Sequence, residues 1–218
     1  MAESAGWVVQ RGPFRGMKYV EAYGDLGAKV LGSYEEELHE TVEQLVAANY
    51  DVIINVGAAE GYYAVGFALR CPQAKVIAYE TSPAGRELCA SMAQLNAVPV
   101  EVRGTFTTGD LADVPDGRTL VLMDIEGGEL ALLDPDVAPS LSLVDHVVEL
   151  HDFVDPSIKE TILARFRDTH DARLVATTPR READYPELTS RTARVLDEHR
   201  PCPMEWAILT RRHTQRLH

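Results

Sequence analysis

Four ionisable side chains stand near the ends of two short apolar runs, and together they could carry out acid–base chemistry. The run TLVLMDIEG ends in Asp124 and Glu126, and the run HVVELHDF ends in Glu149 and His151. Side chains alternate across a β-strand, so Asp124 shares a face with Glu126, and by the same rule Glu149 shares a face with His151. An imidazole can take up a proton near neutral pH, and a neighbouring carboxylate raises its pKa and fixes its tautomer. If the two runs are neighbouring strands, the four groups converge.

Other roles for these side chains stay open at this point. Asp124 and Glu126 could cap a helix that starts at Gly128, and His151 could be a solvated loop residue. Asp124, however, lies inside an otherwise apolar strand, where burial costs several kcal/mol without compensating partners. Asp124, Glu149 and His151 could also hold a divalent metal that lowers the pKa of a bound hydroxyl. No close-spaced ligand pair such as H-x-x-x-H supports the metal.

A glycine-containing turn supplies the second chemical motif. In DVIINVGAAEGYYAVGFAL an apolar strand runs into Gly57–Gly61, and a helix follows immediately. Such a turn brings backbone N–H groups and a helix N-terminus to the carboxyl edge of a sheet. Glu80, nineteen residues after Gly61, ends the next apolar run, where a carboxylate can accept hydrogen bonds from ribose hydroxyls. The combination predicts a nucleotide-type cofactor.

The residues of the turn discriminate between cofactors. In the dinucleotide pattern G-x-G-x-x-G aligned on Gly57, the second and third glycines are replaced by Ala59 and Tyr62. The missing glycines favour a cofactor without a pyrophosphate, and S-adenosylmethionine is such a cofactor. The alternatives are an NAD-dependent oxidoreductase, which Ala59 and Tyr62 disfavour, and a non-catalytic nucleotide-binding module. The acid–base cluster argues against the latter.

NVGAAEG together with Glu80 resembles the first two motifs of class I S-adenosylmethionine-dependent methyltransferases, with Asn55 in place of the usual acidic residue. The run from Asp124 to Glu129 matches the D-x-E-G-x-E of FkbM-type methyltransferases, and the resemblance extends over Tyr34–Leu150. It implies methyl transfer to a hydroxyl or related oxygen, and it makes the two strands of the acid–base cluster neighbours. We therefore predict that Asp124, Glu149 and His151 form one catalytic site, with His151 as the general base. The predicted cofactor-binding residues are Asn55, Gly57, Ala58, Ala59, Gly61, Tyr62, Glu80, Asp110 and Asp124.

Apolar runs bounded by turn residues, separated by segments of helical spacing, predict the elements that position these groups. The predicted strands are Asp51–Val56, Lys75–Glu80, Val100–Arg103, Thr119–Asp124 and Asp145–Leu150. The predicted helices between and after them are Tyr62–Arg70, Pro83–Asn96, Gly128–Leu133 and Pro156–Asp168. Ala172–Thr178 and Met204–Thr210 predict a terminal hairpin. This is an α/β domain with a doubly wound, mainly parallel seven-stranded sheet, a Rossmann-like methyltransferase fold.

The segments outside this core have a different character. Residues 1–50 are predicted to form an N-terminal extension with a helix over Tyr34–Tyr50, capped by Ser33, in which the glutamates at 35–37 serve capping and solvation. Residues 51–178 are the cofactor-binding core, and residues 204–218 are the last strand and tail. Residues 179–203 are long, polar and rich in proline, so we expect a lid with solvated arginines and one helix over Thr189–His199.

Composition limits the classes of partner. With 45% hydrophobic and 25% charged residues, the 218-residue chain is expected to be one globular domain. The net charge of −13 repels polyanions, which argues against nucleic acid. No apolar run could span a bilayer and no signal peptide is apparent, so we expect a cytoplasmic protein that acts on a small-molecule acceptor without a membrane. Three widely spaced cysteines indicate neither disulfides nor structural zinc, and a homo-oligomer stays open.

Overall fold

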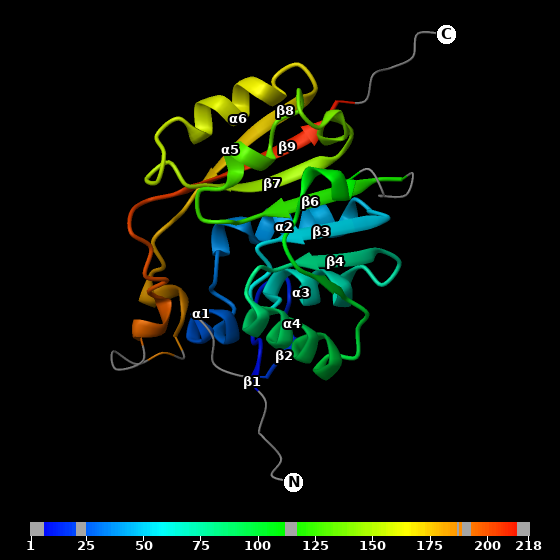
Figure 1. Cartoon of the computed structure of the whole chain (residues 1–218). Helices are drawn as coiled ribbons and strands as arrows, with labels where there is room; N and C mark the ends of the chain where they lie inside the picture. Colours follow the sequence, from blue (N-terminus) through cyan, green and yellow to red (C-terminus); the bar gives the residue numbers. More distant parts are fainter. Residues whose placement is uncertain (1–6, 21–24, 112–116, 187, 189–192, 213–218) are drawn as a thin grey trace.

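The computed structural model describes residues 7–20, 25–111, 117–186, 188 and 193–212. Its centre is a seven-stranded sheet in the order β5-β4-β3-β6-β7-β9-β8 (Figure 1). The strands are β3 (Val52–Val56), β4 (Lys75–Tyr79), β5 (Glu101–Arg103), β6 (Thr119–Met123), β7 (Asp145–Leu150), β8 (His170–Ala176) and β9 (Glu205–Arg211). The predicted fold class is confirmed.

The strands of the predicted core are parallel, and those of the predicted terminal hairpin are antiparallel. The strands from β5 to β7 are all parallel, whereas β9 is antiparallel to both β7 and β8. The terminal hairpin is therefore confirmed, with β9 inserted between β7 and β8. The order also places β6 beside β7, with Leu122 opposite Val147. The carboxyl ends of these two parallel strands thus lie at the same edge of the sheet.

Helices cover both faces of the sheet, as a doubly wound fold requires (Figure 1). One face packs against α2 (His39–Ala47), α3 (Tyr62–Arg70) and α4 (Pro83–Leu95). The other packs against α6 (Ile158–Phe166), with α5 (Glu129–Leu132) nearby. Side-chain alternation holds along β6 and β7, because Leu122 and Val147 enter the first core while Val121 and Val148 enter the second. No helix within the described residues is long and apolar enough to cross a bilayer.

The N-terminal extension differs from the prediction of one helix over Tyr34–Tyr50. It contains a small antiparallel ribbon, β1 (Trp7–Val8) with β2 (Lys18–Tyr19), then α1 (Leu26–Leu31), the 3-10 turn η1 (Glu36–Leu38) and α2. Glu35 has φ = 47°, a left-handed conformation that cannot continue an α-helix, so the helix begins only at His39. Ser33 does not cap it: the Ser33 hydroxyl is buried and faces the carbonyl of Ala28.

The segment after β8 lies beside α1, where Tyr185 and Leu196 pack on Leu31 (Figure 1). It contains the 3-10 turns η4 (Glu182–Asp184) and η5 (Ala193–Leu196). The helix predicted over Thr189–His199 is therefore reduced to η5 in its described part, and residues 189–192 lie outside the described residues. That this segment acts as a lid stays a prediction.

Candidate active site

The predicted cofactor turn lies where β3 runs into α3, and its glycines are structurally required. Gly57 has φ = 79°, and a Cβ there would lie 1.7 Å from the backbone oxygen of Asp124. Gly61 has φ = 96°, and a Cβ there would lie 2.8 Å from the Sγ of Cys89. Any side chain at either position would therefore be strained and would collide with the next layer. The turn brings the backbone of residues 57–61 against the ends of β4 and β6.

Glu80 follows β4 and holds the opposite side of this turn. Its carboxylate accepts hydrogen bonds from the backbone N–H groups of Ala59 at 2.8 Å and Ser82 at 2.7 Å. Each carboxylate oxygen has two lone pairs, so both keep acceptor capacity for a ribose hydroxyl. Gly57, Ala59 and Glu80 line a cleft of about 430 Å³, here called the turn cleft, which also reaches Asp124 and Glu126.

The remaining predicted cofactor residues have different surroundings. Asn55 and Ala58 are buried, and the Oδ1 of Asn55 has no hydrogen-bond partner within the described residues. The ring of Tyr62 packs edge-on against Phe14, a contact that accounts for its burial without a cofactor. Asp110 accepts hydrogen bonds from the N–H and hydroxyl of Thr107, and so closes its own turn. Cofactor contacts of all four stay predictions.

Glu60 connects the turn to the N-terminal extension. Its buried carboxylate accepts a hydrogen bond from the ammonium of Lys29 on α1 at 2.5 Å and from the hydroxyl of Tyr19 at 3.1 Å. Lys29 is itself buried, and its ammonium lies 4.7 Å from the centre of the Tyr34 ring. The extension is thus anchored beneath the turn.

The acid–base cluster assembles at the carboxyl ends of β6 and β7. The Nε2 of His151 lies 3.6 Å from Asp124 Oδ1, 3.4 Å from Glu126 Oε2 and 3.5 Å from Glu149 Oε2. His151 is buried, and among the described residues nothing forms a hydrogen bond with its Nε2. The structure therefore brings together Asp124, Glu149 and His151, while their catalytic roles stay predictions.

Glu129, which was not among the predicted site residues, orients the imidazole. Its Oε1 lies 2.8 Å from Nδ1 of His151, and both side chains are inaccessible to solvent. Burial alone would lower the pKa of His151, but this hydrogen bond and the Glu129 charge raise it above its usual value. With the Nδ1–H donated to Glu129, Nε2 of a neutral imidazole presents its lone pair. The only sequence signal for Glu129 was its place at the end of the D-x-E-G-x-E run.

Burial and neighbouring acids perturb the carboxyl groups. Burial raises the pKa of Asp124 well above its usual range, and the charge of Glu149 adds to the effect. Glu35 is also in the site: burial, then the charge of Glu149, raises its pKa to about 8, against the opposing effects of Arg200 and Tyr63. Burial thus disfavours the charged form of both acids, and Glu35 favours the protonated form at neutral pH.

The expectation that glutamates 35–37 are solvated is wrong for Glu35 and Glu37. Glu35 is buried and accepts hydrogen bonds from the Tyr63 hydroxyl and, at 3.2 Å, from Arg200. Glu37 lies 2.7 Å from Arg180, and its side chain is 2% exposed. Tertiary partners remote in sequence, rather than the helix terminus, decide where these side chains lie.

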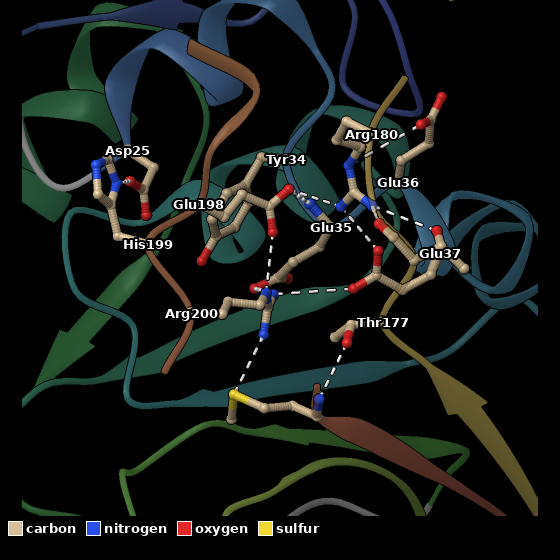
Figure 2. Close-up of polar contacts among 12 residues, drawn as sticks. Asp25, Tyr34, Glu35, Glu36, Glu37, Thr177, Arg180, Glu198, His199 and Arg200 are labelled. Atoms are coloured by element: carbon tan, nitrogen blue, oxygen red, sulfur yellow. Dashed lines mark hydrogen bonds and ion pairs between the residues drawn. The ribbon is translucent and has the colours of Figure 1, made fainter. Parts of the chain in front are cut away.

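The expectation of solvated arginines in residues 179–203 is also wrong in part. Arg180, expected to be solvated, is 4% exposed and pairs with Glu37 and Glu198 (Figure 2). The guanidinium of Arg200 donates hydrogen bonds to three carboxylates, at 2.5 Å to Glu149, 3.0 Å to Glu198 and 3.2 Å to Glu35. No local pattern distinguished these two arginines. Arg181 is exposed, and Arg191 lies outside the described residues.

A second cavity, of about 170 Å³, lies over the cluster; we call it the acidic cavity. The carboxylates that line it are Asp25, Glu35, Asp124, Glu126, Glu149 and Glu198. Asp124 and Glu126 also line the turn cleft, so the two spaces meet at these residues. A third cavity of about 530 Å³ adjoins through Glu198 and Arg200. The arrangement offers one space for a cofactor and an adjoining space for a reactant.

The metal ligands that the geometry supports differ from those predicted. One oxygen each of Asp124 and Glu126 and one nitrogen of His151 lie within 4.8 Å of one another, and oxygen with imidazole is a donor set that divalent cations accept. Glu149 fits less well, because Arg200 already binds its Oε1.

No family model matches the chain, and no curated protein matches it in sequence. Solved structures match in fold. The O-methyltransferase TomG from Streptomyces achromogenes, in complex with SAM, matches at 15% identity and TM-score 0.53, over 82% of this chain and 80% of that one. Cofactor-bound Rv0187 from MTB matches at 14% identity and TM-score 0.53, over 87% and 82%. A putative O-methyltransferase from Klebsiella pneumoniae matches at 11% identity and TM-score 0.51, over 87% and 82%. These similarities show a Rossmann-like methyltransferase fold.

Proposed function

We propose that this protein is an S-adenosylmethionine-dependent methyltransferase that acts on an oxygen of a small molecule. The observation that carries the proposal is the junction of two spaces at Asp124 and Glu126. The turn cleft ends there, and the acidic cavity with the free Nε2 of His151 begins there. The fold shared with the O-methyltransferase TomG, crystallised with SAM, and with cofactor-bound Rv0187 supports the same proposal.

The residues of the turn cleft fit the proposed cofactor. The close approach of Gly57 to the backbone of Asp124 leaves no room for a side chain, and Ala59 and Glu80 present backbone and carboxylate groups to the cleft. When bound, S-adenosylmethionine supplies an electrophilic methyl group on a sulfonium. The chain positions the two reactants, and His151 takes the hydroxyl proton of the acceptor on Nε2. Glu129 holds the imidazole in the required tautomer and stabilises the imidazolium that results.

A divalent metal held by Asp124, Glu126 and His151 is an alternative way to activate the acceptor. In that case Nε2 binds the metal, and His151 is not the general base. Chelation separates the two versions: turnover that is lost with EDTA and regained with Mg²⁺ or Mn²⁺ supports the metal, and turnover unaffected by EDTA supports the base. FkbM-type membership and a cytoplasmic location are further parts of the proposal that rest on the sequence alone.

Calorimetry with S-adenosylmethionine, S-adenosylhomocysteine and NAD tests the proposed function. We expect both sulfur compounds to bind with micromolar affinity and NAD not to bind, because Ala59 and Tyr62 occupy positions where a pyrophosphate site needs glycine. Binding of NAD without binding of S-adenosylhomocysteine would support the oxidoreductase alternative instead. Mass spectrometry of co-purifying small molecules, followed by turnover of His151→Ala and Asp124→Ala on the acceptor so identified, tests the catalytic roles.

A further inference from the structure

The acidic cavity has an unbalanced charge that the proposed function does not require. Six carboxylates line it, against one guanidinium, Arg200, and two imidazoles, His151 and His199. The wall comes from three parts of the chain: the N-terminal extension, the edge of the sheet, and the segment before β9. Figure 2 shows side chains from the first and the last of these, among them Glu35 and Glu198. Arg180, which is not in the wall, also pairs with Glu198 at 2.6 Å, so the acids of the cavity that lack a guanidinium partner are those nearest His151.

The guanidinium of the cavity and the imidazole of His199 already have carboxylate partners. Arg200 donates to Glu35, Glu149 and Glu198, and no part of its guanidinium faces Asp124 or Glu126 within ion-pair distance among the described contacts. His199 lies 3.1 Å from Asp25 (Figure 2).

Asp124 and Glu126 are left with His151 as their nearest basic group, at 3.6 and 3.4 Å. That imidazole is held by Glu129 on its other nitrogen. Burial, and then the charge of Glu149, raises the pKa of Asp124, which agrees with the lack of a cationic partner at this carboxyl.

An independent observation points to a ligand in this space. The side chain of His151 is 1% exposed and lines the cavity, and no group in the described part of the chain forms a hydrogen bond with Nε2. Buried polar nitrogens are almost always satisfied in folded proteins, so an unsatisfied one at a cavity wall calls for a bound group. Tyr34 and Phe153 add aromatic surface to the same wall, and an aromatic face attracts an organic cation.

We propose that the methyl acceptor carries an ammonium group, so that the substrate is a small hydroxylated amine. The ammonium lies against the carboxylates and aromatic rings of the acidic cavity, while the hydroxyl faces Nε2 of His151. The amine determines which molecule binds, and the hydroxyl accepts the methyl group. This inference deepens the proposed function and rests on it.

Three probes of similar shape and different charge test the inference. Tyramine carries a phenol and an ammonium, 4-ethylphenol lacks the ammonium, and 3-(4-hydroxyphenyl)propionate replaces it by a carboxylate. Each is titrated into EDTA-treated protein saturated with S-adenosylhomocysteine, so that no divalent cation competes. We expect tyramine to bind at least about 10-fold more tightly than 4-ethylphenol, which corresponds to about 1.4 kcal/mol, and the propionate to bind most weakly.

Substitutions of cavity carboxylates test whether the preference for tyramine arises in the acidic cavity. Glu126→Gln and Asp25→Asn remove charge from the cavity at side chains that are partly or largely exposed, so folding should survive. Each should reduce the preference for tyramine over 4-ethylphenol at least about 3-fold, as expected for the loss of one nearby charge. Glu87→Gln, an exposed acid on α4 away from the cavity, is the matched control and should keep the preference.

Equal affinity for the neutral probe, tighter binding of the propionate, or no tyramine binding up to about 10 mM overturns the inference. A preference that survives both cavity substitutions overturns it as well. The saturation step keeps this failure distinct from failure of the proposed function. If S-adenosylhomocysteine does not bind, the proposed function is wrong; if it binds and the probes show no preference, only the charge of the acceptor is wrong.

Discussion

The hydrogen bond between Glu129 and His151 sets the protonation state of the proposed base, and its removal has a calculable effect. The contact is 2.8 Å long between two side chains that solvent does not reach. Glu129→Gln keeps the size of the side chain and removes its charge. A hydrogen bond to a charged group is worth about 1.5–3 kcal/mol, and one pKa unit corresponds to about 1.4 kcal/mol. We therefore expect the pKa of His151 to fall by about 1–2 units in Glu129→Gln.

NMR titration of the imidazole signals measures this shift without knowledge of the acceptor, and the signal missing in His151→Asn assigns the residue. Glu126→Gln is the comparison: Glu126 lies 3.4 Å from Nε2 but is 80% exposed, so solvent screens its charge and the shift should be smaller. An unchanged pKa in Glu129→Gln, or a larger shift in Glu126→Gln, would show that Glu129 does not control the imidazole.

The same substitution predicts a change in the dependence of stability on pH. The folded state raises the pKa of His151, so this group contributes stability that is fully present below its unfolded pKa of about 6.5. That contribution is lost as the pH rises through the folded pKa. In Glu129→Gln the loss over this window should become smaller in urea unfolding, and the acid limb of kcat/KM should move to lower pH.

Three further predictions concern other groups. Glu80→Ala should weaken S-adenosylhomocysteine binding about 10- to 150-fold, equivalent to about 1.5–3 kcal/mol, and unchanged affinity by calorimetry would remove Glu80 from the cofactor site. Because folding raises the pKa of Glu35 from 4.5 to about 8, the unfolding free energy should fall as the pH rises between these values. Glu35→Gln should flatten that slope in urea unfolding, and an identical slope in the variant would contradict the assignment. A thiol reagent should modify Cys202 rapidly and spare Cys71 and Cys89 in the folded protein, since both are buried and burial raises the pKa of Cys89 to about 12. Fast loss of all three thiols would contradict the burial.

The core was predictable because its determinants are local. The strand VIINV is buried at every position, and the turn after it needs glycine at Gly57 and Gly61 for reasons of backbone conformation and close packing. Alternation holds within β6 and β7, but β6 ends at Met123 and β7 at Leu150, so it did not place the ionisable residues that follow them. The neighbour relation of these strands, implied by the resemblance to methyltransferases, then brought Asp124 and His151 together.

The surroundings of the acidic cavity were not predictable, because the contacts that form them join residues distant in sequence. The period of apolar residues after Tyr34 indicates a helix, yet Glu35 adopts φ = 47° to reach Tyr63 and Arg200, which is 165 residues away. Nothing in the local sequence distinguishes Arg180 and Arg200 from solvated arginines. Their burial depends on carboxylates from the opposite end of the chain.

Some residues of the candidate site have strained backbone conformations. Ala59, Glu35 and Glu126 all have positive φ although none is glycine, and all three line the turn cleft or the acidic cavity. Conformations of this kind cost of order 1–3 kcal/mol each and persist where surrounding contacts determine them. Glu80 holds Ala59 through its backbone N–H, and Arg200 holds Glu35 through its carboxylate.

Glu126 has no comparable anchor among the described contacts, since its side chain is 80% exposed and approaches only His151 within ion-pair distance. Its strained backbone aims a carboxylate at the junction of the two spaces, where a cation bound by Glu126 and Asp124 would stabilise it. The proposed ammonium group and the alternative metal ion would both provide that contact. Both assign the strain at Glu126 to binding rather than to folding, and Glu126→Gln should therefore alter ligand affinity far more than the free energy of unfolding.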